Sequence, residues 1–328
     1  MRRGSQTSFN QTMENDNDNV RILVIGAGVN GSVCATHLHD RGVDVTVLAR
    51  GERLEHIARE GIVIENPFSH ERTVTRIKTI GELLPDDRYD YILVVVRRNQ
   101  VPGLLPVLAA NHSPNVVFMT NNLAGPGEII RVLGKQRLMM GFVFAGGKRD
   151  GDIIRAIGPT RLPVHASPFG ELEGTVTPRL KRLVRVLNRA GLKAQISTNI
   201  VDWLATHASG VAVIGPMVMK YQNDVKALAR SADDVRLTVA AMRESIAVLK
   251  ALGHKIVPAS QRLLAVVPLF VMEFISRLLF QSRLGEVGTA WHVSQAPDEM
   301  RALAEDLREM VIASGLPVPA IRKVLDMQ

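Results

Sequence analysis

Six residues near the N-terminus constrain the fold more than any other feature of the chain. Gly26-Ala27-Gly28-Val29-Asn30-Gly31 matches the pattern G-x-G-x-x-G. An apolar run, Arg21–Ile25, leads directly into the motif, and a helical pattern continues from residue 32 to about residue 41. A strand, this loop and a helix in that order are typical of a dinucleotide-binding βαβ unit. We therefore predict that all six residues bind a dinucleotide cofactor, at its pyrophosphate.

Each glycine of the loop has its own predicted task. Gly26 permits a tight turn, Gly28 lets the backbone approach the pyrophosphate, and Gly31 lets the helix lie close to the strand. The N-terminus of the helix then presents unpaired N–H groups and the positive end of its dipole to the pyrophosphate.

Short β-branched runs alternate with helical patterns through the first half of the chain. They are Arg21–Ile25, Val45–Leu48, Tyr91–Val96 and Asn115–Met119. This alternation predicts βαβ units on a parallel sheet, and the uninterrupted apolar run 91–96 predicts a central strand covered on both faces. Two further short strands, Asp152–Ile157 and Lys193–Ser197, are predicted to close the sheet domain. They flank a helix that Thr177 caps and that ends near Gly191.

Strand patterns disappear after about Ile200, and helical periodicity replaces them. The predicted fold class is therefore α/β, a Rossmann-type doubly wound parallel sheet followed by an all-helical C-terminal domain. The predicted boundaries are a disordered polar leader at 1–19, an NADP-binding Rossmann domain at 20–198 and a helical substrate domain at 199–328.

Composition excludes several classes of protein. The 328 residues contain a single cysteine, Cys34, which leaves neither an internal disulfide nor a multi-cysteine zinc site, so no metal is predicted and a reducing cytoplasm is compatible. The formal charge of +8 favours an anionic partner. A phosphorylated cofactor or an acidic metabolite fits that charge. Nucleic acid does not, because the cations are scattered and only 4% of residues are aromatic.

The most apolar run, Leu263–Phe280, has about the length of a membrane span. Because it carries Glu273 and Arg277 and has Pro268 near its middle, we predict a buried helix and no membrane association. This helix could belong to the core of a monomer or to the interface of a homodimer.

The residues after the second predicted strand bear on the choice of cofactor. An NAD-binding protein would have Asp or Glu there to bind the ribose hydroxyls. This chain has Ala49-Arg50-Gly51-Glu52-Arg53. A guanidinium forms bidentate, charge-assisted bonds to a 2′-phosphate, so Arg50, helped by Arg53, predicts NADPH. Glu52 leaves NADH open, and Arg50 could instead be a solvated surface cation.

Several motifs in a fixed order carry a resemblance to a known family. They are the glycine loop, Arg97 with Gln100 after the third apolar strand, Asn121 after the next strand, and a helix that begins near Trp203. From about residue 21 to its C-terminus the chain resembles the ketopantoate reductase (2-dehydropantoate 2-reductase) family. The resemblance implies an NADPH-dependent oxidoreductase that reduces a 2-keto acid between a Rossmann domain and a helical domain. It also implies a place in pantothenate biosynthesis.

The resemblance assigns roles to individual residues. It implies that Arg97 and Glu299 contact the cofactor, the latter across the domain cleft, and that Gly147 is a small residue beside it. It places Asn121 next to both the nicotinamide and the substrate.

The chain departs from the family at the position of the proton donor. The family has a Lys two residues after a Trp, followed at four-residue intervals by two Asn that hold the substrate. Here Trp203 is followed by Ala205, and the Asn positions are Ser209 and Val213. This loss of polar groups predicts an altered substrate preference, with Ser209 as the remaining substrate-binding candidate on this helix.

Other residues could supply the proton. His207 is the predicted catalytic residue because a histidine can donate near neutral pH, although it lies about 200° round the helix from Ala205. His292 is a second candidate. Lys220 and Tyr221 would require a turn at Gly215-Pro216. The alternative function is a protein that binds NADPH or a metabolite and has lost catalysis.

Overall fold

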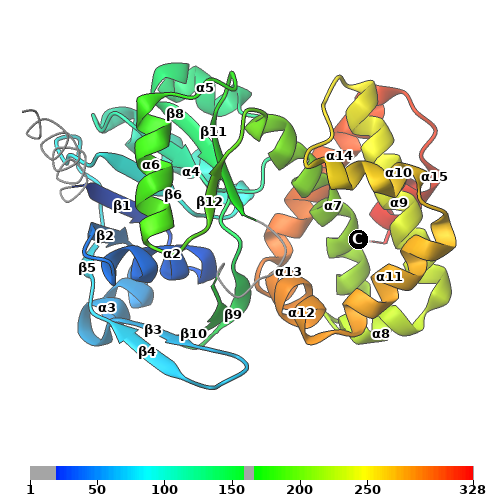
Figure 1. Ribbon diagram of the computed structural model, residues 1–328, viewed down its shortest axis with the longest axis horizontal. Coiled ribbons are helices and arrows are strands. Elements are labelled where there is room, and N and C mark those ends of the chain that lie inside the picture. Colours follow the sequence, from blue (N-terminus) through cyan, green and yellow to red (C-terminus); the bar gives the residue numbers. More distant parts are fainter. Residues whose placement is uncertain (1–19, 159–165, 328) are drawn as a thin grey trace, which may run out of the picture.

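The computed structural model describes residues 20–158 and 166–327, so the predicted leader at 1–19 lies outside the described residues. A sheet-containing N-terminal part and a helical C-terminal part lie side by side (Figure 1). The last strand of the main sheet ends at Ile196, and the first long helix of the C-terminal part begins at Ile200.

The main sheet has eight strands in the order β12-β11-β8-β7-β6-β1-β2-β5. Their bounds are β1 Arg21–Ile25, β2 Asp44–Leu48, β5 Lys78–Ile80, β6 Tyr91–Val94, β7 Val116–Phe118, β8 Leu138–Gly141, β11 Ser167–Glu171 and β12 Ala194–Ile196. The strands from β5 to β8 are parallel, and β11 runs antiparallel to β8. The chain builds outward from β1 first toward β5 and then toward β8, so the winding direction reverses between β1 and β6.

Helices cover both faces of this sheet (Figure 1), as the predicted fold class requires. They are α2 Val29–His39, α3 Gly51–Glu60, α4 Val101–Ala110, α5 Gly127–Leu133 and α6 Pro178–Arg189, with short 3-10 helices η1 Arg98–Gln100 and η2 Lys135–Arg137. Side chains alternate along a strand. Ile22 and Val24 of β1 therefore pack with α2 and α6, whereas Leu23 and Ile25 pack with α4 and α5. The central position predicted for residues 91–96 is confirmed, because β6 lies between β1 and β7 with all four residues buried.

Helix α6 begins as its sequence predicts. The Thr177 hydroxyl accepts a hydrogen bond from the Leu180 amide at 3.2 Å, and Pro178 occupies the first helical position. This cap satisfies one of the amides that a helix start leaves unpaired. The apolar side chains of the helix from Leu180 to Leu187 face the core.

The predicted strand at 152–157 forms, but it does not join the main sheet. It is β10, Ile153–Ile157, in a second sheet of order β4-β3-β10-β9. The other strands are β3 Ile62–Glu65, β4 Arg72–Thr75 and β9 Gly146–Asp150. A tight turn with Gly151 at φ +57° folds β10 back on β9, so the hairpin rather than the main sheet satisfies its backbone groups.

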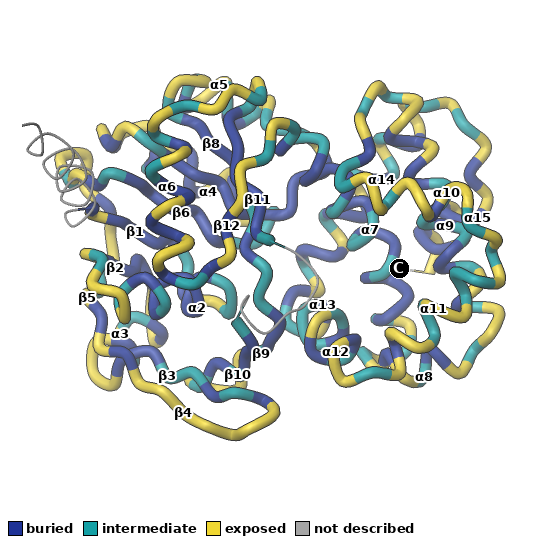
Figure 2. Tube along the Cα trace, viewed as in Figure 1, coloured by how far each residue is buried: buried dark blue, intermediate teal, exposed yellow. Residues whose placement is uncertain are grey.

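The C-terminal part is helical. Its elements are α7 Ile200–Lys220, α8 Val225–Arg230, α9 Ala232–Ala251, η4 Ala259–Arg262, α10 Leu263–Val266, α11 Leu269–Gln281, α12 Arg283–Gly285, the π-helix η5 Glu286–Ala290, α13 Trp291–Gln295, α14 Pro297–Ser314 and α15 Pro319–Leu325. Stripes of apolar residues on α7, α9 and α14 meet in one core, visible as dark blue tube in Figure 2. The helical prediction for this part is confirmed.

The apolar run 263–280 does not form the buried helix that its composition predicts. The chain breaks at Pro268 between α10 and α11, and within the run only Leu264 and Phe280 are buried. No helix in the described part of the chain is long and apolar enough to cross a membrane.

Candidate active site

The glycine loop lies where the winding of the sheet reverses, between the carboxyl ends of β1 and β6. A Cβ on Gly26, whose φ is +110°, would lie 2.3 Å from the Val95 carbonyl oxygen. A Cβ on Gly31 would lie 1.9 Å from the Gly26 carbonyl oxygen. Both glycines are thus required by close backbone contacts. A crevice at such a reversal point is where open α/β sheets bind ligands.

Gly28 differs from its two neighbours. It is the N-cap of α2, and a Cβ built on it would meet no atom within 4 Å. No side chain caps this helix, and its first turn contains no acidic residue. The open space above Gly28 and the unpaired amides at the positive end of α2 fit an anionic pyrophosphate.

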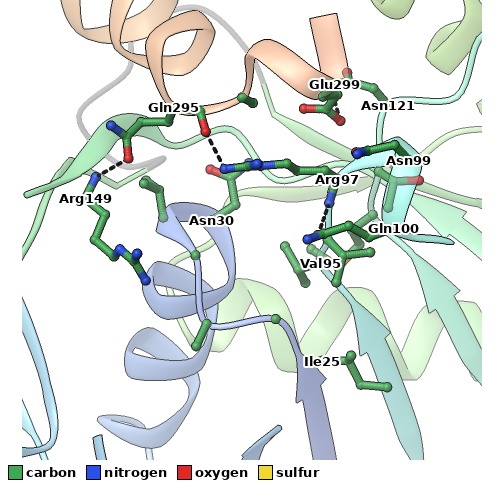
Figure 3. Close-up of a pocket in the computed structure, with 18 of the residues that line it drawn as sticks. Ile25, Asn30, Val95, Arg97, Asn99, Gln100, Asn121, Arg149, Gln295 and Glu299 are labelled. Atoms are coloured by element: carbon green, nitrogen blue, oxygen red, sulfur yellow. Dashed lines mark hydrogen bonds between the residues drawn. The ribbon is translucent and has the colours of Figure 1, made fainter. Parts of the chain in front are cut away.

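A cavity of about 650 Å³ adjoins this loop and extends to the helical part. Its size lies within the ~300–1,000 Å³ typical of small-molecule sites. Ten of the eleven predicted cofactor residues line it, namely Gly26, Ala27, Gly28, Val29, Asn30, Arg50, Arg97, Asn121, Gly147 and Glu299. Gly31 is not among the lining residues, because it supports the loop from behind. Figure 3 shows the loop on one side and α14 on the other.

Four arginines line the cavity, and Arg53 is the most buried of them. Its Nε donates to the Ala27 carbonyl at 3.3 Å, and its Nη1 donates to the Asp152 carbonyl at 3.0 Å. Its Nη2 is buried without a partner among the described residues. Burial lowers the pKa of Arg53, and the nearby charge of Arg149 lowers it further, with Asp152 opposing. An anion between the guanidinium groups of Arg53 and Arg149 would give the buried charge of Arg53 a partner and would offset the repulsion between the two cations.

Arg50 and Glu52 lie in different places. Arg50 is the exposed N-cap residue of α3 and lines the cavity. Glu52 is exposed in the first turn of α3 and is not among the residues that line the cavity. The residues that follow β2 therefore contribute cations to this wall of the cavity and no carboxylate. That arrangement suits a 2′-phosphate better than two ribose hydroxyls.

Arg97 connects the two parts of the chain. Its guanidinium donates to Asp298 at 2.8 Å and to the Gln295 carbonyl, as Figure 3 shows for the latter contact. Burial alone would raise the pKa of Asp298, but hydrogen bonds from Asn99 and Arg97 outweigh it and hold that pKa below the ordinary range. Arg97 lines the cavity as predicted, but its charge is already paired across the domain boundary.

Glu299 makes a second connection between the domains. Its Oε1 accepts from the Arg98 backbone amide at 3.0 Å and from the Asn121 side-chain amide at 3.3 Å. Glu299 is buried, with only 3% of the residue exposed. The side-chain oxygen of Asn121 is buried without a partner among the described residues, so this residue retains one acceptor at the cavity.

Replacing Glu299 with Ala is expected to lower the free energy of unfolding by about 2–3 kcal/mol, because two buried donors lose a charged acceptor. Urea unfolding followed by circular dichroism measures this change. Glu299→Gln keeps an acceptor oxygen and should lose less than half as much. Equal losses for the two variants would contradict the assigned contacts.

Gly147 has a structural explanation that the family resemblance does not supply. A Cβ on it would lie 2.5 Å from the Arg155 carbonyl oxygen in the neighbouring strand β10. The close packing of β9 on β10 therefore already requires glycine at this cavity-lining position.

The face of α7 that carries Ala205, Ser209 and Val213 does not line the cavity. All three residues are buried, and Ala205 and Val213 belong to the helical core. The Ser209 hydroxyl donates to the Thr206 carbonyl at 2.9 Å and lies 3.5 Å from the Ser245 hydroxyl of α9. The methyl group of Ala205 and the isopropyl group of Val213 need no polar partner, which matches their place in this core.

The two candidate histidines also differ. The ring of His207 stacks on Trp203 with centroids 5.2 Å apart and lies 4.5 Å from the ring of Phe142. It is not among the residues that line the cavity. His292 of α13 does line it, with its Nε2 3.9 Å from Oε2 of Glu299. Arg149 and Gln295 also line the cavity, and no sequence motif singles them out.

The chain matches known proteins at low identity. The family model of the ketopantoate reductase PanE/ApbA matches residues 22–165. The 2-dehydropantoate 2-reductase of Pyrococcus horikoshii is 24% identical over 186 residues, which cover 56% of this chain. This match spans only 58% of that relative's length.

Solved structures match over nearly the whole chain. The 2-dehydropantoate 2-reductase from Geobacter metallireducens GS-15 aligns with a TM-score of 0.76 at 17% identity, covering 94% of this chain and 98% of the other. D-mandelate dehydrogenase with NADH and anilino(oxo)acetate aligns with a TM-score of 0.74 at 14% identity, covering 94% and 96%. Ketopantoate reductases are NAD(P)-dependent oxidoreductases. The resemblance that the motifs predict is thus confirmed: residues 22–165 match the ketopantoate reductase family, and the described chain shares its fold.

Proposed function

We propose that this protein is an NADPH-dependent oxidoreductase that reduces a 2-keto acid or a related carbonyl compound in the cavity between its two domains. The observation that carries the proposal is the start of α2, which no side chain caps and which lies at the reversal point of the sheet. The cavity wall beside it contains Arg50 and also Arg53, whose Nη2 is buried without a partner among the described residues. Residues Gly26–Gly31 would hold the pyrophosphate and Arg50 the 2′-phosphate. The single buried cysteine suits a cytoplasmic location.

The proposed chemistry needs a proton at the carbonyl oxygen. NADPH supplies a hydride to the carbonyl carbon when it is bound. His292 is our candidate for the proton donor, in place of His207, because it lines the cavity and its Nε2 lies 3.9 Å from the Glu299 carboxylate. The unpaired oxygen of Asn121 would accept a hydrogen bond from a donor at the reacting end of the cavity, such as a substrate hydroxyl or the nicotinamide amide. Ser209 has no part in this proposal, since it lies in the helical core.

The experiment is a titration of the purified protein with NADPH and with NADH, followed by ketopantoate and a panel of 2-keto acids while the absorbance of the reduced nicotinamide is recorded. Binding of NADPH with turnover of at least one acid supports the proposal. A role in pantothenate biosynthesis would require ketopantoate to be the preferred substrate. Failure to bind either cofactor would falsify the whole proposal.

Replacing Arg50 with Ala is expected to weaken NADPH binding by about 10- to 100-fold, because a charge-assisted contact to the 2′-phosphate contributes roughly 1.5–3 kcal/mol. The affinity for NADH should change less than about twofold, since NADH has no group at that position. Fluorescence titration with each cofactor measures the two affinities and therefore the ratio of NADPH to NADH binding. Arg41→Ala, an exposed cation after α2, is the matched control and should leave both affinities unchanged. Equal losses for both cofactors would rule out the assigned role.

A second candidate function is cofactor or metabolite binding without catalysis. The burial of Ala205 and Val213 in the helical core favours it, because the residues at the family's proton-donor position and at one of its substrate positions are apolar here. This alternative predicts NADPH binding without oxidation by any tested acid. Turnover of one such acid would eliminate it.

A further inference from the structure

The outward face of α10 and α11 is an exposed apolar surface. Six of its residues define what we call the α11 patch: Val266, Phe270, Phe274, Ile275, Leu278 and Leu279. Val266 is 75% exposed, Phe270 70% and Phe274 63%. Figure 2 shows exposed stretches along α11, which lies on the side of the helical part remote from the main sheet.

The patch is continuous because of its spacing. Phe270, Phe274 and Leu278 follow one another in steps of four on α11, so their side chains lie in a row along that helix. Val266 ends α10, just before the break that precedes α11. Ile275 and Leu279 form a second row directly beside the first. At roughly 150–200 Å² for each fully exposed side chain, the exposed fractions amount to roughly 650 Å² of apolar surface.

The charged residues of α11 turn away from this surface. Glu273 accepts a hydrogen bond from Arg236 of α9 at 3.0 Å. Arg277 donates to the Ala229 carbonyl of α8 at 3.1 Å. Both charges of the helix thus face the protein, and the face toward solvent has none. A surface helix ordinarily has the opposite arrangement.

We propose that the α11 patch is the interface of a homodimer, with the same patch of a second copy as its partner. The largest apolar patch of a typical monomer is about 300–600 Å², so this one exceeds what a monomer usually leaves exposed. A standard interface buries about 800 Å² on each partner, and the roughly 650 Å² of the patch alone is about four-fifths of that area. The inference does not depend on the proposed function.

Two-fold symmetry explains why an uncharged patch suits this partner. In such a dimer the same surface appears on both copies, so a charge near the axis would meet a like charge. None of the six residues is charged, and the patch is therefore complementary to itself. Its aromatic centre, Phe270 and Phe274, is typical of the buried core of interfaces.

Two other occupants fit less well. Residues 1–19 contain only Met1, Phe9 and Met13 as large apolar residues, too few to cover six exposed apolar side chains. An interfacial membrane helix has Lys and Arg along its polar face. The only cation within α11 is Arg277, which faces the protein. Arg262 and Arg283 flank the patch at its two ends, so anionic vesicles are included in the test.

The test compares the wild-type chain with the double variant Phe270→Glu/Phe274→Glu by sedimentation velocity at micromolar concentrations. The wild type is expected at twice the 36.0 kDa of the chain, and the variant at 36.0 kDa. Its dimer dissociation constant should rise at least about 100-fold, because each substitution would bury an unpaired charge at the interface centre. Far-UV circular dichroism verifies that the variant is folded.

Ile312→Glu is the matched control. Ile312 is 75% exposed on α14 in the same domain but outside the patch, so this variant should remain dimeric. Labelling of an introduced cysteine tests the same interface without adding a charge to it. Burial raises the pKa of the Cys34 thiol to about 12, which leaves an introduced cysteine as the reactive one. Phe274→Cys should react with a maleimide more slowly than Ile312→Cys, and increasingly so as the protein concentration rises.

Three outcomes would overturn the proposal. The first is a monomeric wild type at these concentrations. The second is a double variant that remains dimeric, which would place the interface elsewhere. The third is a monomer that floats with phosphatidylserine vesicles and loses this property on Phe270→Glu/Phe274→Glu, which would identify the patch as a membrane-binding surface.

Discussion

Replacing His292 with Ala is expected to lower kcat at least about 100-fold with the best 2-keto acid, because a positioned general acid contributes roughly 10²–10⁴ in rate. The KM for NADPH should remain nearly unchanged, since the loop at Gly26–Gly31 and Arg50 would hold the cofactor. Steady-state kinetics with each substrate varied in turn separate the two effects.

Two other histidines make the His292 experiment selective. His112→Gln alters an exposed imidazole just beyond the C-terminal end of α4, outside the residues that line the cavity, and should leave kcat unchanged. His207→Gln removes a ring that packs on Trp203 and Phe142, and it should lower kcat far less than His292→Ala. A larger loss for the His207 variant would restore the prediction made from the sequence and remove His292 from the mechanism.

Replacing Gly31 with Ala is expected to weaken NADPH binding at least about 100-fold and to lower the free energy of unfolding by about 1–3 kcal/mol. The added Cβ would lie 1.9 Å from the Gly26 carbonyl oxygen, so the loop and the start of α2 must move apart. Cofactor titration and urea unfolding of the same preparation measure both quantities.

Gly28→Ala separates cofactor binding from folding. Its Cβ would meet no protein atom within 4 Å, so stability should not fall. The methyl group would occupy the space in which the pyrophosphate approaches the backbone, and NADPH binding should weaken about as much as in Gly31→Ala. Gly127→Ala, whose Cβ also meets nothing within 4 Å, controls for the change of residue type. Unaltered binding in Gly28→Ala would mean that the cofactor does not approach the loop there.

The contacts between the domains explain how a cavity of this size keeps its shape. Asp298 and Glu299 lie in the first turn of α14 and bind the start of η1 and Asn121, three residues after β7. The side-chain oxygen of Gln295 accepts a hydrogen bond from the Arg149 backbone amide at 3.3 Å. These bonds join residues about 150–200 positions apart in the chain, so the cavity wall depends on how the helical part is placed against the sheet.

Local patterns in the sequence determined much of this protein. The strand, glycine loop and helix at residues 21–39, the continuous central strand at 91–94 and the Thr177 cap all formed as predicted. Each depends on residues within a few positions of one another, through steric limits at glycine, alternation along a strand or a cap on a helix start. Such local preferences survive in any tertiary context that leaves the elements intact.

Only the tertiary structure decided the rest. Strand β10 pairs with β3, about ninety residues away, and no local pattern specifies that partner. Whether a helix face points into a cavity or into a core depends on neighbouring helices. Thus Ala205 and Ser209 became core residues, whereas His292 reached the cavity. The same reason applies to α11: composition marks it as apolar, but packing against α8 and α9 turned its charges inward and left its phenylalanines exposed.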